Sequence, residues 1–251
     1  MVEICCVEKT MRLYYIMYVQ KAIYIRKYRK EIKMNRIKKW ITLCLAGAVT
    51  VASSMMSAVN VQAAEYWPDN ISVSSGAAIV VELQTGTVLY EKDADTSYYL
   101  ASITKVMTAL LALENSSLDD QVTFTEECLA DQTSDSGNIG MQVGEVLTMR
   151  QCLLALMIRS ANDVATQIAV QIAGSVAAFA DMMNQKAQEL GCVNTHFVNA
   201  SGMPDENHYT TPYDLYLIFN EAITYSTFTD AISQKNYTVT YTAGDGEQYE
   251  R

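Results

Sequence analysis

Two short motifs contain the residue types that nucleophilic catalysis needs. Ser102 and Lys105 are three positions apart, and Ser160 and Asn162 begin a second motif 58 positions after Ser102. Side chains three apart on a helix lie on one face, so the Lys105 amine is within reach of the Ser102 hydroxyl. Acyl transfer through a serine requires a base for the hydroxyl proton and hydrogen-bond donors for the oxyanion. The spacing therefore predicts a serine acyl-transfer site.

Each motif alone also has a purely structural interpretation. Ser102 is a typical helix N-cap residue and Lys105 a typical solvated lysine, while Ser160 and Asn162 are typical of a turn between helices. A single Ser-x-x-Lys is a weak signal. Ser-x-x-Lys followed by Ser-x-Asn, however, matches two parts of a serine acyl-transfer signature whose third part is Lys-Thr-Gly. The combination favours the catalytic interpretation.

The pattern of apolar residues predicts an α+β fold. A hairpin is expected over 77–82 and 87–91, followed by a helix from Ser102 to about residue 114. Amphipathic helices and a later alternating strand are expected in the second half: helices at 149–160, 164–174, 175–190 and 212–222, and a strand at 237–242. Strands on either side of a helical block favour a sheet with a helical subdomain.

The charge distribution argues against nucleic-acid binding. The chain has 251 residues and a formal net charge of −10. Eleven of its 18 basic residues but only three of its 28 acidic residues precede position 64, so the remainder is strongly acidic. Nucleic-acid binding needs a basic surface, which this body lacks.

Cysteine and histidine usage argues against a metal centre, a disulfide framework and a Ser-His-Asp triad. Only Cys128, Cys152 and Cys192 follow position 63, without a Cys-x-x-Cys pair. The two histidines, His196 and His208, do not lie beside a plausible nucleophile in the sequence. We therefore expect no metal and no cofactor.

The first 63 residues have the features of a targeting sequence. Arg36, Lys38 and Lys39 form a basic region, 41–59 are apolar or small without charge, and 61–63 fit a signal-peptidase site before Ala64. We expect Met34 to be the true start, residues 1–33 to be an extension, 34–63 a signal peptide and 64–251 the catalytic domain. An uncleaved membrane anchor is the alternative interpretation of the apolar segment.

Four segments together resemble the serine-type D-alanyl-D-alanine carboxypeptidases, which are low-molecular-weight penicillin-binding proteins. They are 101–110 (ASITKVMTAL), 159–165 (RSANDVA), 194–203 (NTHFVNASGM) and 208–215 (HYTTPYDL). The resemblance implies a β-lactamase/transpeptidase-like fold, in which a mainly antiparallel sheet is flanked by helices and a helical subdomain. It also implies export to the cell wall or the outer face of the membrane, with peptidoglycan stem peptides as substrate and β-lactam antibiotics as acylating ligands.

The same resemblance implies a role for each motif residue. Ser102 is expected to be the acyl-forming nucleophile and Lys105 its general base. Ser160 is expected to relay a proton toward the leaving D-alanine, and Asn162 to hold Lys105 and the substrate amide. The segment 199–203 is expected to be a structural loop near the cleft without a catalytic role.

One part of the family pattern has no counterpart. Lys235 is followed by Asn236 and Tyr237, and no Lys-Thr-Gly occurs in the 251 residues. We therefore expect a C-terminally truncated chain that lacks the final strand or strands, together with any C-terminal membrane anchor. The missing strand would carry a carboxylate-binding lysine and an oxyanion donor worth about 10²–10³ in rate. Whether the truncated chain is active is therefore left open by the sequence.

Two other functions stay open at this point. A serine β-lactamase shares Ser-x-x-Lys and Ser-x-Asn, but it would use a glutamate about 35 residues after Ser160. The segment 191–197 (GCVNTHF) has none. A non-catalytic wall-binding or penicillin-binding remnant is the alternative that the missing Lys-Thr-Gly favours.

Overall fold

The computed structural model describes residues 2–5, 72–130, 132 and 136–250. The predicted signal peptide at 34–63 and most of the predicted extension at 1–33 lie outside these residues. Of the extension, only strand β1 (Val2–Cys5) is described, and it pairs in parallel with strand β2 (Ala77–Glu82). The domain boundaries that the sequence suggests therefore stay a prediction.

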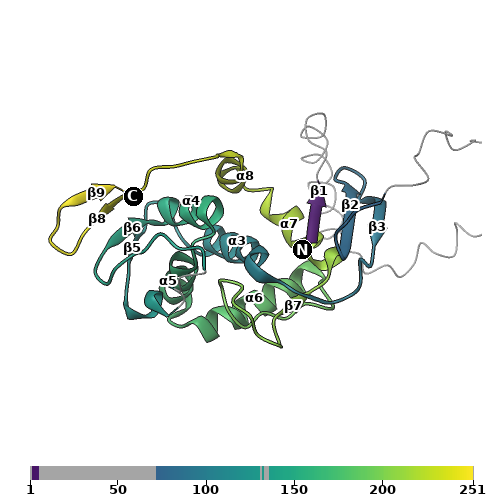
Figure 1. The fold of residues 1–251 in the computed structure, drawn as a ribbon, viewed down its shortest axis with the longest axis horizontal. Coiled ribbons are helices and arrows are strands. Elements are labelled where there is room, and N and C mark those ends of the chain that lie inside the picture. Colours follow the sequence, from purple (N-terminus) through teal and green to yellow (C-terminus); the bar gives the residue numbers. More distant parts are fainter. Residues whose placement is uncertain (1, 6–71, 131, 133–135, 251) are drawn as a thin grey trace, which may run out of the picture. The chain divides into compact units, whose positions relative to one another are not determined.

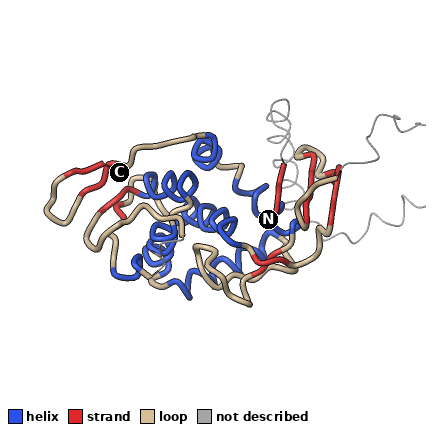
Figure 2. Tube along the Cα trace, viewed as in Figure 1, coloured by secondary structure: helices blue, strands red, loops and turns tan. Residues whose placement is uncertain are grey.

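The described strands form three small sheets, and every pairing other than β1 with β2 is antiparallel (Figures 1 and 2). The first sheet has the order β1-β2-β3, the second pairs β4 with β7, and the third has the order β5-β6-β8-β9. The remaining strands are β3 (Thr87–Lys92), β4 (Tyr98–Tyr99), β5 (Gln121–Thr123), β6 (Val146–Thr148), β7 (Tyr209–Thr210), β8 (Thr240–Thr242) and β9 (Gln248–Glu250).

The predicted hairpin is confirmed as β2 and β3. Gly86 in the connecting turn has φ of 70°, a conformation that glycine adopts without steric cost. The register shifts between Val80 and Val81, which marks a bulge. Ile79 and Val81 are buried, and Tyr216 of helix α7 (Pro212–Ala222) packs against their cluster. The hairpin is thereby attached to the helical part of the chain.

The helices begin and end at residues whose chemistry explains the boundary. Helix α4 (Met149–Arg159) starts with a capping box in which Thr148 and Gln151 satisfy each other's backbone N–H groups. The Ser175 side chain caps α6 (Val176–Leu190), and Thr211 caps α7 with Pro212 in its first turn. The other helical elements are η1 (Ala101–Thr104), α3 (Lys105–Asn115), η2 (Glu126–Leu129), α5 (Asn162–Ala173) and α8 (Ser226–Ser233).

Helix α3 lies inside the main hydrophobic core. Its residues from Lys105 to Ala112 are all buried, and the helix contacts α4, α5, α6 and α7 (Figure 1). Cys152 is fully buried in the same core, as its position on an apolar helical face predicted. Cys128 packs in this core as well, and burial raises the pKa of its thiol to about 11.

Two local features differ from the sequence-based expectations. Ser102 lies in a 3₁₀ turn, and the α-helix begins only at Lys105. The strand expected at 237–242 is reduced to Thr240–Thr242, because only that part has a partner strand. The alternating pattern at 237–239 is real, but only Val239 of these three is buried.

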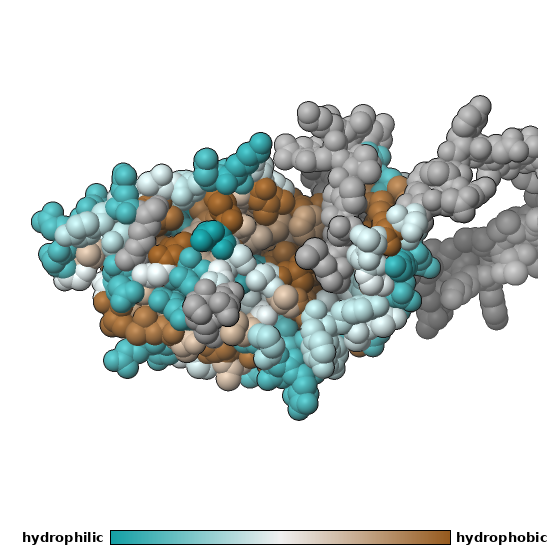
Figure 3. All heavy atoms as spheres, viewed as in Figure 1, coloured by the Kyte–Doolittle hydropathy of each residue, from teal (hydrophilic) through white to brown (hydrophobic). Residues whose placement is uncertain are grey.

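No single described helix is long and apolar enough to span a bilayer; α5 and α6 reach that length and hydropathy only jointly, across a bend of 83°. Hydrophobic residues also reach the surface beside hydrophilic ones on the face drawn in Figure 3. Scattered exposure of this kind is normal for a folded domain.

Candidate active site

The structure brings Ser102, Lys105 and Asn162 together. The Lys105 Nζ lies 3.3 Å from the Ser102 Oγ, one helical turn away, as the spacing predicted. Lys105 also donates to the Asn162 Oδ1 at 2.6 Å and to the Ser201 carbonyl at 2.5 Å. Its side chain is only 2% exposed, so the structural alternative of a solvated lysine is wrong.

The Lys105 Nζ lies within hydrogen-bond distance of oxygens from separate parts of the chain. Ser102 precedes the same helix, Asn162 is the first residue of α5, and Ser201 belongs to the loop before β7. A hydroxyl, a side-chain amide and a backbone carbonyl supply these oxygens. The amine is therefore held in a fixed direction, with the Ser102 hydroxyl as one of its neighbours.

Ser160 lies in the turn between α4 and α5, as the sequence predicted. It ends α4 in the left-handed region with φ of 56°, and the Asn162 backbone N–H donates to the Gly137 carbonyl. The Ser160 backbone thereby leads directly into Asn162, whose side chain contacts Lys105. The structure thus groups three of the four predicted site residues directly and places the fourth two positions before Asn162.

The backbone before Ser102 is in an unfavourable conformation. Ala101 has φ of 56°, a region that L-residues other than glycine seldom occupy and that costs about 1–3 kcal/mol. Gly202 packs directly against it: a β-carbon at this glycine would overlap the Ala101 carbonyl group. The Ser-Gly pair at 201–202 therefore contacts both the lysine and the turn that presents Ser102.

A buried carboxylate holds the neighbouring loop. Asp163 is fully buried and accepts backbone N–H groups from Ile139, Met141 and Val164, at 3.0 to 3.3 Å. It lies in the first turn of α5, where the helix dipole favours negative charge. Asp163 fixes the 139–141 segment beside the Ser160 turn, a positioning role that the sequence motif alone does not reveal.

His208 is joined to the Ser102 turn through Thr104. The His208 Nδ1 accepts the Val198 N–H at 3.1 Å, so the ring proton is assigned to Nε2, which donates to the Thr104 Oγ1 at 2.7 Å. The Thr104 hydroxyl in turn donates to the Ala101 carbonyl at 2.8 Å. No sequence pattern connects His208 with the nucleophile, because the two are far apart in the chain.

The stability of the fold should depend on pH through His208. Burial lowers its pKa from 6.5 to about 4, with a smaller contribution from His196, against the opposing effect of Asp205. The unfolded state therefore binds more protons than the folded state between these two pH values. The contribution of His208 to the free energy of unfolding is fully present above pH 6.5 and is lost as the pH falls toward 4. We expect a loss of about 2 kcal/mol after allowance for solvent screening.

Urea unfolding at pH 4.5, 5.5 and 7 measures this slope. In His208→Gln the part of the slope due to this histidine should disappear. An unchanged slope would show that His208 is not the group that titrates.

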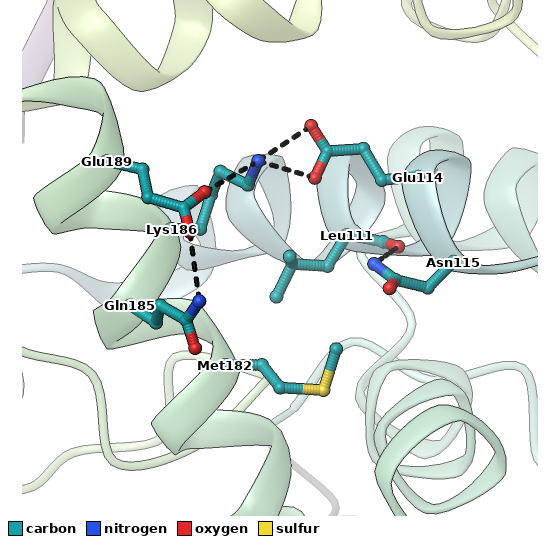
Figure 4. A pocket seen from close by; sticks show the side chains of 7 residues that line it. All are labelled: Leu111, Glu114, Asn115, Met182, Gln185, Lys186 and Glu189. Carbon is teal, nitrogen blue, oxygen red and sulfur yellow. Dashed lines mark hydrogen bonds and ion pairs between the residues drawn. The ribbon is translucent and has the colours of Figure 1, made fainter.

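A second cluster of charged residues lies between α3 and α6 (Figure 4). Lys186 binds Glu114 at 2.8 Å and Glu189 at 3.3 Å beside a cavity of about 200 Å³. Burial alone would lower the pKa of Lys186, but the hydrogen bonds and charges of the two glutamates raise it. Glu114 is near the end of α3 opposite Ser102, roughly 14 Å along the helix from Lys105. This cluster is an ion pair between α3 and α6 and contains no nucleophile.

The chain belongs to the D-alanyl-D-alanine carboxypeptidase family, peptidase family S11. The sequence profile of this family matches residues 60–249. A D-alanyl-D-alanine carboxypeptidase from Streptomyces sp. K15 is 38% identical over 166 residues, covering 61% of this chain and 56% of the relative. DacF from Bacillus subtilis is 34% identical over 158 residues, covering 61% of this chain and 40% of that protein. The chain thus spans about half the length of these curated relatives.

The fold expectation is confirmed by solved structures. The crystal structure of the Streptomyces K15 DD-transpeptidase superimposes with a TM-score of 0.69 at 31% identity, covering 72% of this chain and 73% of the other. The D-alanyl-D-alanine carboxypeptidase DacD from Francisella tularensis gives a TM-score of 0.63 at 29% identity, covering 72% of this chain and 44% of the other. The chain has the fold of these DD-peptidases.

Proposed function

We propose that this chain is a serine D-Ala-D-Ala carboxypeptidase that trims the terminal D-alanine of peptidoglycan stem peptides. The observation that carries the proposal is the buried Lys105 amine, 3.3 Å from the Ser102 hydroxyl and held by Asn162. Family membership supports the reaction class, and the names of the relatives support the substrate.

The proposed reaction proceeds through an ester on Ser102. The Ser102 Oγ attacks the carbonyl carbon of the penultimate D-alanine while its proton passes to the Lys105 Nζ. The carbon–nitrogen bond then breaks, and Ser160 relays a proton to the departing D-alanine amine. Water hydrolyses the ester and restores the free hydroxyl. A Lys105 amine that accepts this proton has Asn162 and the Ser201 carbonyl ready to bind the resulting ammonium.

Asn162 is proposed to contact the substrate as well as Lys105. Its Oδ1 is used by Lys105, and its Nδ2 lies 3.4 Å from the Met203 sulfur. Sulfur is a weak acceptor, so a substrate carbonyl would be the stronger partner for this amide. The backbone N–H of Ser102 lies in the first turn of η1, where N–H groups lack intrahelical acceptors, and it is the proposed oxyanion donor from this part of the chain.

The proposed location is outside the cytoplasm, at the wall or the outer membrane face. The signal-peptide pattern at 34–63 and the substrate class support this location. β-Lactam antibiotics would acylate the same serine, as the resemblance to the low-molecular-weight penicillin-binding proteins implies.

Mass spectrometry after incubation with benzylpenicillin tests the proposed function. We expect one covalent adduct with the mass of the intact drug, mapped to the peptide that contains Ser102, and no adduct on Ser102→Ala. D-alanine release from a peptide ending in D-Ala-D-Ala is the second readout. An adduct that persists in Ser102→Ala, or the absence of any adduct, would contradict the proposal. Rapid hydrolysis of penicillin with little accumulated adduct would indicate a β-lactamase.

A further inference from the structure

A groove of about 460 Å³ adjoins the Ser160 turn. One wall is the α4 face ending at Arg159, and the opposite wall is the irregular segment between α8 and β8 (Figure 1). Its lining residues are Asn138, Ile139, Leu154, Ala155, Ile158, Arg159, Lys235, Asn236, Tyr237 and Val239. The groove is therefore apolar along α4 and polar along its rim.

The groove is positively charged in an otherwise acidic body. Only seven basic residues follow position 63, and two of them, Arg159 and Lys235, line this groove, whereas none of its described lining residues is acidic. In the described part of the chain, Lys186 is paired with glutamates, whereas no ion pair involves Arg159 or Lys235. Two unneutralised cations over an apolar floor suit a ligand that carries both carboxylate and alkyl groups.

The position of the groove connects it with the proposed active site. Arg159 directly precedes Ser160, and Ile139 is bound to the Asp163 carboxylate next to Asn162. A β-carbon on Gly137 would come within 2.7 Å of the Ser160 carbonyl, so the loop that leads to Asn138 packs on the same turn. The groove and the Ser-x-Asn turn are thus joined by the chain at Arg159 and by the contacts of the 137–139 loop.

We propose that this groove binds an acidic peptide segment of the substrate, on the N-terminal side of the scissile D-Ala-D-Ala bond. Arg159 and Lys235 bind its carboxylate, and Leu154 and Ile158 contact its alkyl groups. This inference rests on the proposed function, which it deepens by naming the substrate class. It assigns specificity to two residues outside the catalytic motifs.

A pair of matched peptides tests the proposal. Both end in D-Ala-D-Ala and carry an N-terminal fluorophore; one has a glutamate upstream and the other has glutamine there. Binding is measured by fluorescence anisotropy on Ser102→Ala, so that turnover is not required. We expect the glutamate peptide to bind about three- to tenfold more tightly, the range that one or two exposed ion pairs supply. The preference should shrink as salt rises.

Variants locate the effect in the groove. Lys235→Gln and Arg159→Gln in the Ser102→Ala background should each reduce the preference for glutamate, and the double variant should abolish it. Arg150→Gln is the matched control, because Arg150 is an exposed arginine at the other end of α4 and does not line the groove. Lys235→Gln is the more telling single variant, since Arg159 adjoins Ser160.

The outcomes separate this proposal from the proposed function. Equal binding of the two peptides, or a preference that survives the double variant, overturns the groove assignment even if penicillin labels Ser102. A preference lost equally in Arg150→Gln would show a general charge effect and would also overturn it. Failure of penicillin labelling bears on the proposed function alone, because peptide binding is measured on the inactive serine variant.

Discussion

Replacing Lys105 with methionine should slow acylation of Ser102 by benzylpenicillin about 10³-fold. The Lys105 amine is the only proposed acceptor for the Ser102 proton, and loss of a general base typically costs about 10²–10⁴ in rate. Methionine is of similar length and apolar, so it fills the buried space without leaving a charge there. The acylation rate is measured by mixing the protein with penicillin, quenching the reaction at set times and quantifying the adduct by mass spectrometry.

Lys186→Met is the matched control for this experiment. Lys186 also lies against α3, but its partners are Glu114 and Glu189 rather than the Ser102 hydroxyl. Its loss should leave the acylation rate within about twofold, because it breaks only a partly exposed ion pair. Acylation of Lys105→Met at the wild-type rate, with the fold intact by circular dichroism, would show that another group takes the serine proton.

Replacing Gly202 with alanine should disrupt the turn that presents Ser102. Gly202 has φ of 85°, and its added β-carbon would overlap the Ala101 carbonyl group, which is backbone and cannot rotate away. Conformational strain and steric overlap together should cost about 3 kcal/mol of unfolding free energy. Because the Ala101 peptide must move, acylation should also fall at least about tenfold, as reactions depend on placement within about 1 Å.

Gly174→Ala separates the effect of backbone strain from the effect of steric overlap. Gly174 ends α5 with φ of 78°, but a β-carbon added there would have no atom within 4 Å. The free energy of unfolding of Gly174→Ala should therefore fall by only about 1 kcal/mol, and Ser102 in this variant should be acylated at the wild-type rate. Urea unfolding and penicillin labelling of both variants provide the comparison. Equal effects at the two glycines would refute a special contact between Gly202 and the nucleophile turn.

Local elements and the identity of the chemical groups could be read from the order of the amino acids. Capping at Thr148, Ser175 and Thr211 and the turn at Gly86 depend on interactions within a few residues, so these boundaries could be predicted. The Ser102–Lys105 contact could also be predicted, since one helical turn brings the two side chains together. The family resemblance then supplied the reaction class.

The way those groups are held depends on contacts between distant parts of the chain. The Asn162 and Ser201 oxygens reach Lys105 from 57 and 96 positions away, and His208 reaches Thr104 from 104 positions away. No periodicity encodes such contacts, because they arise when α3, α5 and the loop before β7 pack into one core. The amino-acid order thus specifies which residues perform the proposed chemistry. Tertiary packing buries Lys105, sets Gly202 against Ala101 and forms a basic groove beside Ser160.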